Sequence, residues 1–239
     1  MRQIYTGIVI KSIDYNASDR IITILSSDDS FVVFKARGVN KMNSPLMKYT
    51  IPFSISEFEL ESKGEMSNKT LVAANSVFYP RNINENIESI ALFSYISESL
   101  NYIDSFKGLY DYVKDLIEAV ESGKDVRWMF LNYLNYFIKC NGLSLCLDKC
   151  VSCGSKSHIV DVDYVAGGYL CSSCSINRKA MSYIESLYGL NRSKGVYLND
   201  KLEDGDLFVI IKDLLSFLND NSGIKIKSEK FLLNSLFNM

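Results

Sequence analysis

Histidine, tryptophan and proline are scarce in this chain, and the scarcity excludes several kinds of enzyme. Among 239 residues there are one histidine, one tryptophan and three prolines. With His158 as the only histidine, a serine or cysteine catalytic triad is disfavoured. There is also no phosphate-binding P-loop, no dinucleotide fingerprint and no Gly-x-Ser-x-Gly elbow. Asp161 and Asp163 lack the context of a nuclease site and are interpreted as a solvated turn. The sequence therefore predicts a binding protein and not an enzyme.

Long apolar runs and a strong charge imbalance are also missing. No stretch approaches the roughly 18–20 apolar residues of a membrane span, and residues 1–5 do not open an apolar signal segment. We therefore expect the cytosol as the compartment. Charged residues make up 23% of the chain and the formal net charge is −2, whereas apolar residues make up 47%. The chain is thus expected to fold, and any nucleic-acid binding must depend on locally concentrated positive charge.

Four of the six cysteines form two tight pairs, Cys150 with Cys153 and Cys171 with Cys174. A Cys-x-x-Cys segment turns the backbone so that two thiolates converge on one metal ion, and a second pair completes the tetrahedron that zinc prefers. The gap of 17 residues between the pairs is typical of such sites. Four thiolates leave no open position for water or substrate. The predicted site is therefore structural, with one Zn²⁺ that is coupled to local folding.

Other interpretations of the cysteines stay open. Two disulfides have the same spacing, but reduced thiols in the cytosol favour a metal. Two redox pairs would require a thioredoxin-like context, which is absent, and iron also accepts four thiolates. Cys140 is predicted to be a buried apolar thiol. Cys146 has the wrong spacing for a metal-binding pair, and His158 is expected to face solvent in a loop.

Residues 1–79 are predicted to form a small barrel. β-Branched and aromatic residues recur with a period near two over residues 4–11, 20–26, 30–36, 51–60 and 70–78. Asp28 and Asp29 separate the second strand from the third as a hairpin turn. Five short strands cannot cover both faces of a flat sheet. A closed five-stranded oligonucleotide-binding (OB) barrel is therefore expected, with an SH3-like barrel as the alternative.

After Tyr79 and Pro80 the hydrophobic period becomes helical. Helices are predicted over residues 83–104, 109–120, 126–140, 178–190, 203–220 and 228–237. The zinc module, at about residues 142–177, interrupts them. The predicted fold is therefore α+β and multidomain: an OB-fold domain over residues 1–79, then an all-helical domain over residues 80–239 that carries the four-cysteine zinc module.

Basic residues gather in three clusters. The first, between Phe34 and Thr50, contains no acidic residue and consists of Lys35, Arg37, Lys41 and Lys48. The second follows the zinc module and consists of Arg178, Lys179, Arg192 and Lys194. The third, near the end of the chain, consists of Lys225, Lys227 and Lys230. Cations bind phosphates and nearby aromatic rings stack on bases, so we predict nucleic-acid contacts at Lys35, Arg37, Lys41, Lys48, Arg178 and Lys179.

Phe34, Tyr49 and Phe53 are candidates for stacking, with core aromatics beside a solvated loop as the alternative. Acidic residues at positions 57–61 and 203–206 are candidates for acidic faces that would give the chain an oriented electrostatic field. Ordinary solvated surface is the favoured interpretation of both runs.

Several motifs taken together resemble one known family, the bacterial recombination mediator RecO. The specific part is Gly142, then Leu147 and Cys150-x-x-Cys153-Gly154, followed by Gly167-Gly168-x-x-Cys171-x-x-Cys174. Weaker matches are Lys35-Ala-Arg-Gly38, with Lys41 and Ser44, and Lys225-Ile-Lys-Ser228 before Phe231. Leu145 stands where the family commonly has proline, a departure that concerns the local turn and not the metal.

The resemblance implies a protein that binds single- and double-stranded DNA without catalysis and anneals complementary strands. It implies that RecR is a partner, with which the protein helps load RecA onto DNA coated by the single-strand-binding protein. It also implies that the helical domain contacts the acidic C-terminal tail of that protein. Lys225, Lys227 and Lys230 are candidates for the tail or for DNA. The expected location is the cytoplasm, with nucleoid association when the protein is on DNA.

Two other functions stay open at this point. In the first, the chain is a zinc-stabilised scaffold that binds only proteins, and its barrel is structural. In the second, the barrel binds RNA, because stacking and phosphate contacts do not by themselves distinguish RNA from DNA.

Overall fold

The computed structural model describes residues 1–62, 68–103, 106–193, 195–199 and 202–237. The chain packs into two compact units. The first combines residues 1–93 with 104–121, and the second combines residues 94–103 with 122–239. The boundary therefore runs through a helix and does not coincide with the change from strands to helices near Pro80. The predicted domain bounds, residues 1–79 and 80–239, stay a prediction.

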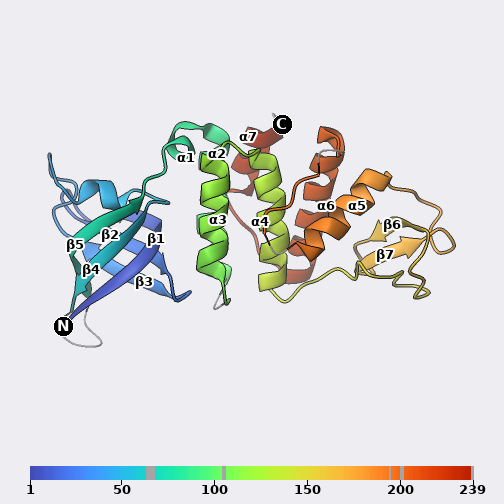
Figure 1. Cartoon of the computed structure of the whole chain (residues 1–239), viewed down its shortest axis with the longest axis horizontal. Helices are drawn as coiled ribbons and strands as arrows, with labels where there is room; N and C mark the ends of the chain where they lie inside the picture. Colours follow the sequence, from blue (N-terminus) through green and yellow to red (C-terminus); the bar gives the residue numbers. More distant parts are fainter. Residues whose placement is uncertain (63–67, 104–105, 194, 200–201, 238–239) are drawn as a thin grey trace. The chain divides into compact units, whose positions relative to one another are not determined.

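The first five strands close into a barrel (Figure 1). Their order around it is β1-β2-β3-β5-β4. Their bounds are β1 Arg2–Asp14, β2 Arg20–Ser26, β3 Phe31–Ala36, β4 Ile55–Glu61 and β5 Lys69–Phe78. All neighbours are antiparallel except β3 and β5, which pair in parallel only at Phe34–Lys69 and Lys35–Thr70. This five-stranded closed barrel confirms the predicted OB fold.

Strand β1 is buried on both of its faces at its centre. Ile8, Val9 and Ile10 are consecutive and all buried, whereas simple alternation predicts that only every second residue is covered. Val9 lies in the barrel core with Ile22, Ile24 and Phe58. The β1 strand is also contacted by helix α3 (Leu109–Glu121), which belongs to the same unit. A β-bulge between Val9 and Lys11 adds curvature there.

The connection between β3 and β4 differs from the prediction. A strand was expected over residues 51–60, but β4 begins at Ile55. A short 3-10 helix, η1 (Met47–Thr50), precedes it. Phe53 has a φ of 65° and its N–H donates to the carbonyl of Val9 at 2.7 Å. The residues before β4 therefore form a turn that is tied to β1, and no continuation of the strand.

The predicted helix over residues 83–104 is broken at Asn86. It consists of α1 (Asn82–Glu85), α2 (Ile87–Ser99) and the 3-10 helix η2 (Leu100–Tyr102). The Asn86 side-chain oxygen accepts hydrogen bonds from the N–H groups of Glu88 at 2.8 Å and Ser89 at 3.2 Å. Such a cap satisfies backbone donors that a new helix leaves free. The break is therefore the start of α2.

Helix α3 is capped from the barrel. The carboxylate of Asp29, in the turn between β2 and β3, accepts hydrogen bonds from the N–H groups of Gly108 at 2.7 Å and Tyr110 at 2.8 Å. A carboxylate is favoured at a helix N-terminus because it satisfies free donors and complements the helix dipole. Asp29 is thus more than a turn residue, since it ties the β2–β3 hairpin to α3.

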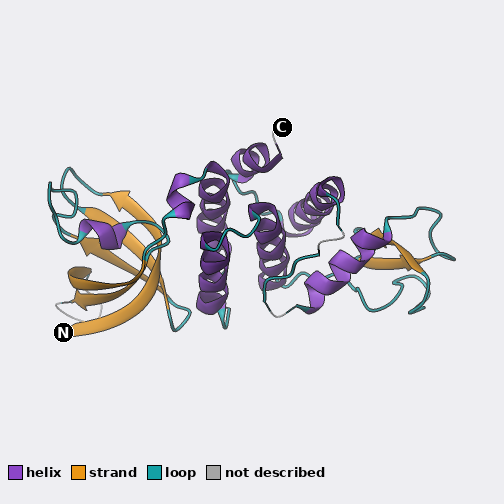
Figure 2. Cartoon of the chain, turned by 45° about the horizontal axis from the view of Figure 1, so that its top comes forward, coloured by secondary structure: helices purple, strands orange, loops and turns teal. Residues whose placement is uncertain are grey.

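Among its described residues, the second unit contains four helices after residue 122 and one small hairpin (Figure 2). Their bounds are α4 Val126–Cys140, α5 Met181–Arg192, α6 Asp204–Ser222 and α7 Glu229–Phe237. The hairpin pairs β6 (Ile159–Asp163) with β7 (Gly168–Cys171) in antiparallel fashion, and the sequence did not predict it. Tyr95 packs edge-on against Phe130 and Tyr133 in the core of this unit. No described helix is both long and apolar enough to cross a membrane.

Candidate metal centre and nucleic-acid interface

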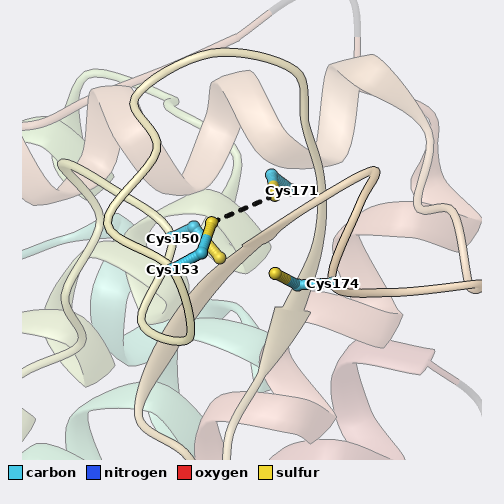
Figure 3. Close-up of side chains that lie close together, drawn as sticks. All are labelled: Cys150, Cys153, Cys171 and Cys174. Atoms are coloured by element: carbon cyan, nitrogen blue, oxygen red, sulfur yellow. Dashed lines mark hydrogen bonds between the residues drawn. The ribbon is translucent and has the colours of Figure 1, made fainter.

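The sulfur atoms of Cys150, Cys153, Cys171 and Cys174 lie within 4.8 Å of one another (Figure 3). Cys150 and Cys171 are buried, whereas Cys153 is exposed and Cys174 is partly exposed. Within the described part of the chain, this is the one group of three or more histidine, cysteine or acidic side chains that could hold a metal ion. The structure therefore brings together all four predicted ligands.

The distances fit one tetrahedral ion better than disulfides. Four sulfurs at about 2.3 Å from a zinc ion lie about 3.8 Å from each other. The sulfurs of Cys153 and Cys171 are 3.5 Å apart, which is too far for a disulfide bond of about 2.05 Å. All six cysteines are free thiols in this structure. The four cysteines are therefore close enough together to hold one metal ion.

Backbone hydrogen bonds position the two cysteine turns. Gly154 N donates to the carbonyl of Cys150 at 2.9 Å, and Ser175 N donates to that of Cys171 at 3.0 Å. Gly154 has a φ of 79°, a conformation that other residues rarely adopt, so glycine is needed to complete the first turn. The hairpin β6–β7 then brings the second turn to the first, because Val151 N donates to the carbonyl of Tyr169 at 2.8 Å.

The electrostatics of the cluster favour a cation. Burial raises the pKa of Cys150, but backbone N–H groups of Cys153, Cys171 and Ser152 outweigh it and lower the pKa to about 6. Backbone N–H groups also lower the pKa of Cys171. For Cys153, the N–H of Ser155 lowers the pKa, but the three neighbouring thiols raise it to about 12. The backbone thus stabilises some of the thiolates, but ionisation of all four cysteines is opposed by repulsion between their negative charges. A bound cation would offset this repulsion.

Buried polar groups join the metal segment to the helices of its unit. Tyr183 of α5 donates a hydrogen bond to Asp213 of α6 at 2.6 Å, and its hydroxyl lies 2.7 Å from that of Tyr164 in the β6–β7 turn. Burial raises the pKa of both tyrosines, so they remain neutral donors. The Tyr169 hydroxyl donates to the carbonyl of Ile184 at 2.7 Å. This network fixes the module against α5 and α6.

Asp161 and Asp163 have separate structural roles. Asp163 accepts hydrogen bonds from the N–H groups of Val165 and Ala166, each at 2.9 Å, and so forms the predicted turn. Asp161 is buried and accepts a hydrogen bond from the hydroxyl of Ser175 at 2.7 Å. The prediction of a solvated pair was therefore wrong for Asp161, which supports the residue that follows the second cysteine turn.

The remaining cysteines and the histidine lie outside the cluster. Cys140 is only partly buried, so the prediction of a buried thiol holds in part, and burial raises its pKa to about 12. Cys146 pairs as an isolated β-bridge with Gly168. A Cβ atom at Gly168 would collide with the Cys146 carbonyl oxygen, so glycine is required for this close approach. His158 is exposed, as predicted.

A groove of about 370 Å³ crosses the outer surface of β2, β3 and the start of β5. Its lining includes Tyr15, Val33, Lys35, Arg37 and Lys69. The strand register explains this combination, because Ile21 of β2 pairs with Lys35, which pairs with Thr70 of β5. Tyr15 is 62% exposed. The groove therefore combines an exposed aromatic ring with three cations on the face that OB folds use for oligonucleotides. Sequence reasoning missed Tyr15 and Lys69.

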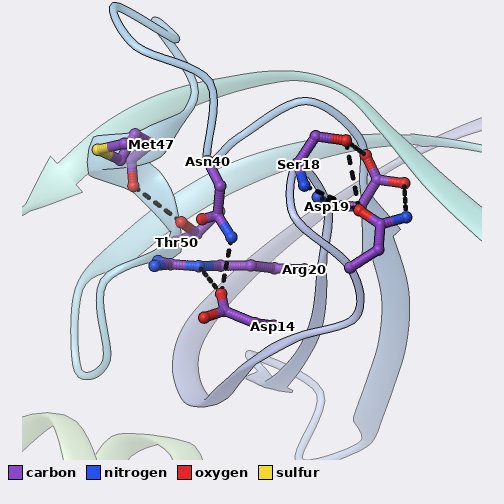
Figure 4. Close-up of polar contacts among 8 residues, drawn as sticks. Asp14, Ser18, Asp19, Arg20, Asn40, Met47 and Thr50 are labelled. Atoms are coloured by element: carbon purple, nitrogen blue, oxygen red, sulfur yellow. Dashed lines mark hydrogen bonds and ion pairs between the residues drawn. The ribbon is translucent and has the colours of Figure 1, made fainter.

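The loop between β1 and β2 is held by polar contacts among its own residues, including Ser18 and Asp19 (Figure 4). Asn16 accepts hydrogen bonds from the N–H groups of Ser18 at 2.9 Å and Asp19 at 2.8 Å. Lys35 Nζ lies 2.9 Å from the Asp19 carboxylate and 4.3 Å from the centre of the Tyr15 ring. The Lys35 ammonium, together with the N–H of Gly38, holds the pKa of Asp19 far below its ordinary value. Asp19 thus pins the end of β3 to this loop.

The other residues of the first basic cluster differ in their availability. Arg37 and Lys41 are exposed and form no ion pair with any described residue. Lys48 is exposed and lies 4.9 Å from the centre of the Tyr49 ring. Phe34 and Phe53 are 2% and 6% exposed. These two rings are core residues and cannot stack on bases, and Tyr49 is partly buried against the barrel core.

In the second basic cluster, the two predicted contacts have different surroundings. Arg178 is exposed. Lys179 is half-buried, with its Nζ 3.2 Å from Asp213 and 4.7 Å from the centre of the Tyr183 ring. The charge of Lys179 is therefore already paired within the fold. Arg192 lies 3.8 Å from Asp148, and Lys194 is outside the described residues.

The third basic cluster surrounds the start of α7. Lys225, Lys227 and Lys230 are exposed. The carboxylate of Glu98 accepts hydrogen bonds from the N–H groups of Lys227 at 2.7 Å and Ser228 at 2.9 Å, and from the Ser228 hydroxyl at 2.8 Å. Burial raises the pKa of Glu98, but these donors outweigh it and lower the pKa below its ordinary value. Glu98 therefore fixes the backbone that carries the three lysines.

Changing Glu98 to alanine should destabilise this unit by about 1–2 kcal/mol at pH 7, the usual cost of a lost helix cap. A lowered folded-state pKa means that the Glu98 contribution is complete above the pKa of the unfolded chain, near 4.3. It declines as the pH falls through the folded-state value. The difference in unfolding free energy between wild type and variant should therefore shrink below about pH 4.

Urea unfolding between pH 7 and pH 3 measures this difference. Glu203→Ala is the matched control, because Glu203 precedes α6 but makes no side-chain cap hydrogen bond. An equal loss of stability in both variants at pH 7 would contradict the capping role of Glu98.

Comparison with known proteins now places the chain in a family. Residues 1–77 match the model described as recombination protein O N terminal, and residues 83–186 match that described as recombination protein O C terminal. DNA repair protein RecO from Listeria welshimeri is 25% identical over 236 residues, covering 95% of this chain and 92% of that protein. The protein of the same name from an Exiguobacterium species is 23% identical over 247 residues, covering 97% and 96%. Together with the OB barrel and the helical unit that carries the cysteine cluster, these matches show that the chain belongs to the RecO family of DNA repair proteins.

Proposed function

We propose that this protein is a recombination mediator that binds single-stranded DNA on the outer face of its barrel and anneals complementary strands. The observation that carries the proposal is the groove with exposed Tyr15 beside Lys35, Arg37 and Lys69. Cations that follow a backbone and an aromatic ring that accepts a base are the usual elements of single-strand binding. The names of the relatives, DNA repair protein RecO, support a role in recombinational repair.

Annealing requires that two phosphate backbones approach while their bases stay free. The groove residues Arg37 and Lys69, with the exposed Lys41, would neutralise phosphates without reading sequence. Tyr15 would stack on a base and hold the strand in one orientation. Arg178 is a further candidate for phosphate contact, and double-stranded DNA would bind through the same phosphates. We infer no catalytic step, because binding and release of strands suffice for annealing.

The cysteine cluster would hold one structural Zn²⁺. Four thiolates with no free position for a substrate favour zinc in a structural role. Cys150, Cys153, Cys171 and Cys174 would coordinate the ion, and the network of Tyr183, Asp213 and Tyr164 would transmit its ordering to the helices. The metal would therefore support the surface that carries the lysines of the third cluster.

We propose that RecR binds this protein, that the acidic tail of the single-strand-binding protein binds near Lys225, Lys227 and Lys230, and that together they assist RecA loading. The charge of the three exposed lysines complements such a tail. These events would take place in the cytoplasm, at the nucleoid when the protein is on DNA.

The test is the annealing rate of two complementary oligonucleotides with and without the full-length protein, from about 50 mM to 200 mM salt. We expect acceleration at low salt that declines steeply as salt rises, because phosphate binding releases counterions. Acceleration that is independent of salt would contradict the mechanism. Absence of both annealing and DNA binding at low salt would favour the alternative, a zinc-stabilised scaffold that binds only proteins.

A further inference from the structure

The barrel is closed by a short pairing between β3 and β5, which leaves most of one edge of β5 without a β3 partner. Strand β5 pairs with β3 only through Lys69 and Thr70, whereas it pairs with β4 along most of its length, from Thr70 to Phe78. On the β3 side, the segment 71–78 therefore has no strand partner among the described residues. The loop and turn hydrogen bonds of the described chain do not satisfy this edge either. Such an edge presents backbone N–H and C=O groups that can pair with another chain.

A groove of about 690 Å³ lies directly along this edge. One wall is Val72, Ala73 and Ala74 of β5, and the other is the connection from Ser44 to Ile51, which includes η1. Val72 is 37% exposed and Met47 is 38% exposed. The groove is thus a largely apolar channel beside the part of β5 that has no β3 partner among the described residues. It is separate from the Tyr15 groove, since the two share no lining residue.

The chemistry of the groove favours an extended peptide over nucleic acid. Its single charged lining residue is Lys48, which is exposed and forms no ion pair with a described residue. One cation is too few for a strand of phosphates, and the one aromatic ring in the lining, Tyr49, is partly buried and lies beside Lys48. An extended peptide would satisfy the backbone edge, place alternate side chains in the channel, and match Lys48 with an acidic group.

We propose that the β5 edge and its groove form a docking site for an extended segment of a partner protein that carries a large apolar side chain and an acidic residue. The segment adds to β5 as a strand over residues 71–74. Its apolar side chain packs between Val72 and Met47, and its carboxylate pairs with Lys48. This surface differs from the proposed DNA face and from the three C-terminal lysines.

The test uses a synthetic, fluorescently labelled ten-residue peptide with alternating β-branched residues, one central phenylalanine and two aspartates near one end. Its binding to the full-length protein is measured by fluorescence anisotropy up to about 1 mM, a limit that detects weak interactions. We expect binding, together with slower hydrogen exchange in residues 71–75. Val72→Glu should weaken it by about tenfold or more, because a carboxylate then lies against apolar side chains. Lys48→Glu should weaken it as well.

The matched control is Val165→Glu, the same change at a residue that is 100% exposed in another part of the chain; it should leave binding unaffected. A peptide with proline at its centre should not bind, because it lacks the donor for strand pairing. Four results would overturn the proposal: no binding by any peptide, equal binding by the proline peptide, no effect of Val72→Glu, or an equal effect of Val165→Glu. Loss of single-stranded DNA binding in Val72→Glu, with peptide binding intact, would assign the groove to nucleic acid instead.

Discussion

Changing Cys153 to serine is expected to remove the metal ion and to unfold the segment around residues 142–177. Structural zinc contributes on the order of 10 kcal/mol to the folding of small zinc modules, whereas a typical substitution costs about 1 kcal/mol. The segment has only one short hairpin, β6–β7, and its cysteine turns face each other through sulfur atoms that repel one another when ionised. Without the cation, little holds the two turns together.

Two measurements test the effect of Cys153→Ser. Metal content of the purified protein should fall from one ion per chain to a small fraction, and amide exchange in β6 and β7 should become fast. The Tyr164–Tyr183–Asp213 network should also loosen, because Tyr164 lies in the turn between these strands. Exchange in the barrel strands β2 and β3 should stay slow, since those strands have a hydrophobic core of their own. A chelator added to the wild-type protein should reproduce the same pattern.

Cys146→Ser is the matched control. Cys146 is four residues before Cys150 and lies outside the cluster, so this variant should keep its metal and its slow exchange. Full metal content in Cys153→Ser would show that the ligand assignment is wrong. Equal loss in both variants would show that the segment depends on its cysteines in some other way.

Features that depend on a local pattern could be predicted from the sequence. The two Cys-x-x-Cys pairs carry their own geometry, because each pair is formed by one turn of backbone. The β2 strand and the α4 helix were predicted with the bounds that the structure has, since their side-chain periodicity is uninterrupted. The four-cysteine cluster and the closed barrel followed from such patterns.

Features that depend on contacts between distant segments could not be predicted. Asp29 looks like an ordinary turn residue, and only the position of α3 shows that it caps that helix. Glu98 and Ser228 are 130 positions apart. Tyr15 lies in the β1–β2 loop and Lys69 at the start of β5. They line one groove because Tyr15 lies beside Lys35 of β3, and β3 pairs with β5 in one register. A sequence pattern indicates which face of a strand is buried, but not which other strand lies beside it.

The second large effect is expected at the groove lined by Tyr15, Lys35, Arg37 and Lys69. Changing Tyr15 to alanine should weaken binding of a single-stranded oligonucleotide by about 1–3 kcal/mol, the usual value of one stacked base. Binding of a duplex of equal length should change much less, because its bases are already stacked on each other. Fluorescence anisotropy with both substrates at one salt concentration measures the two losses. A loss of equal size on both substrates would argue against base stacking by Tyr15.

The basic residues of the same face should act differently, and the structure ranks them. Arg37→Ala should weaken binding to every sequence. It should also reduce the steepness of the plot of log binding constant against log salt concentration by about 0.7 for a single strand. Lys35→Ala should have a smaller effect, because the Lys35 ammonium already pairs with Asp19 at 2.9 Å. Breaking this ion pair to bind a phosphate offsets part of the binding free energy that the phosphate contact contributes. The triple change of Lys35, Arg37 and Lys41 to alanine should lower both affinity and annealing rate.

Arg2→Ala is the control for the basic residues. Arg2 is an exposed cation of the barrel that is paired with Glu59 and Glu61, and it does not line the groove. It should therefore bind DNA like the wild type. If Arg2→Ala weakens binding as much as Arg37→Ala, the protein attracts DNA through its overall electrostatic potential and not through the groove. If only the groove variants weaken it, and Tyr15 separates single strands from duplex, the DNA lies across β2 and β3, where one ring and unpaired cations meet.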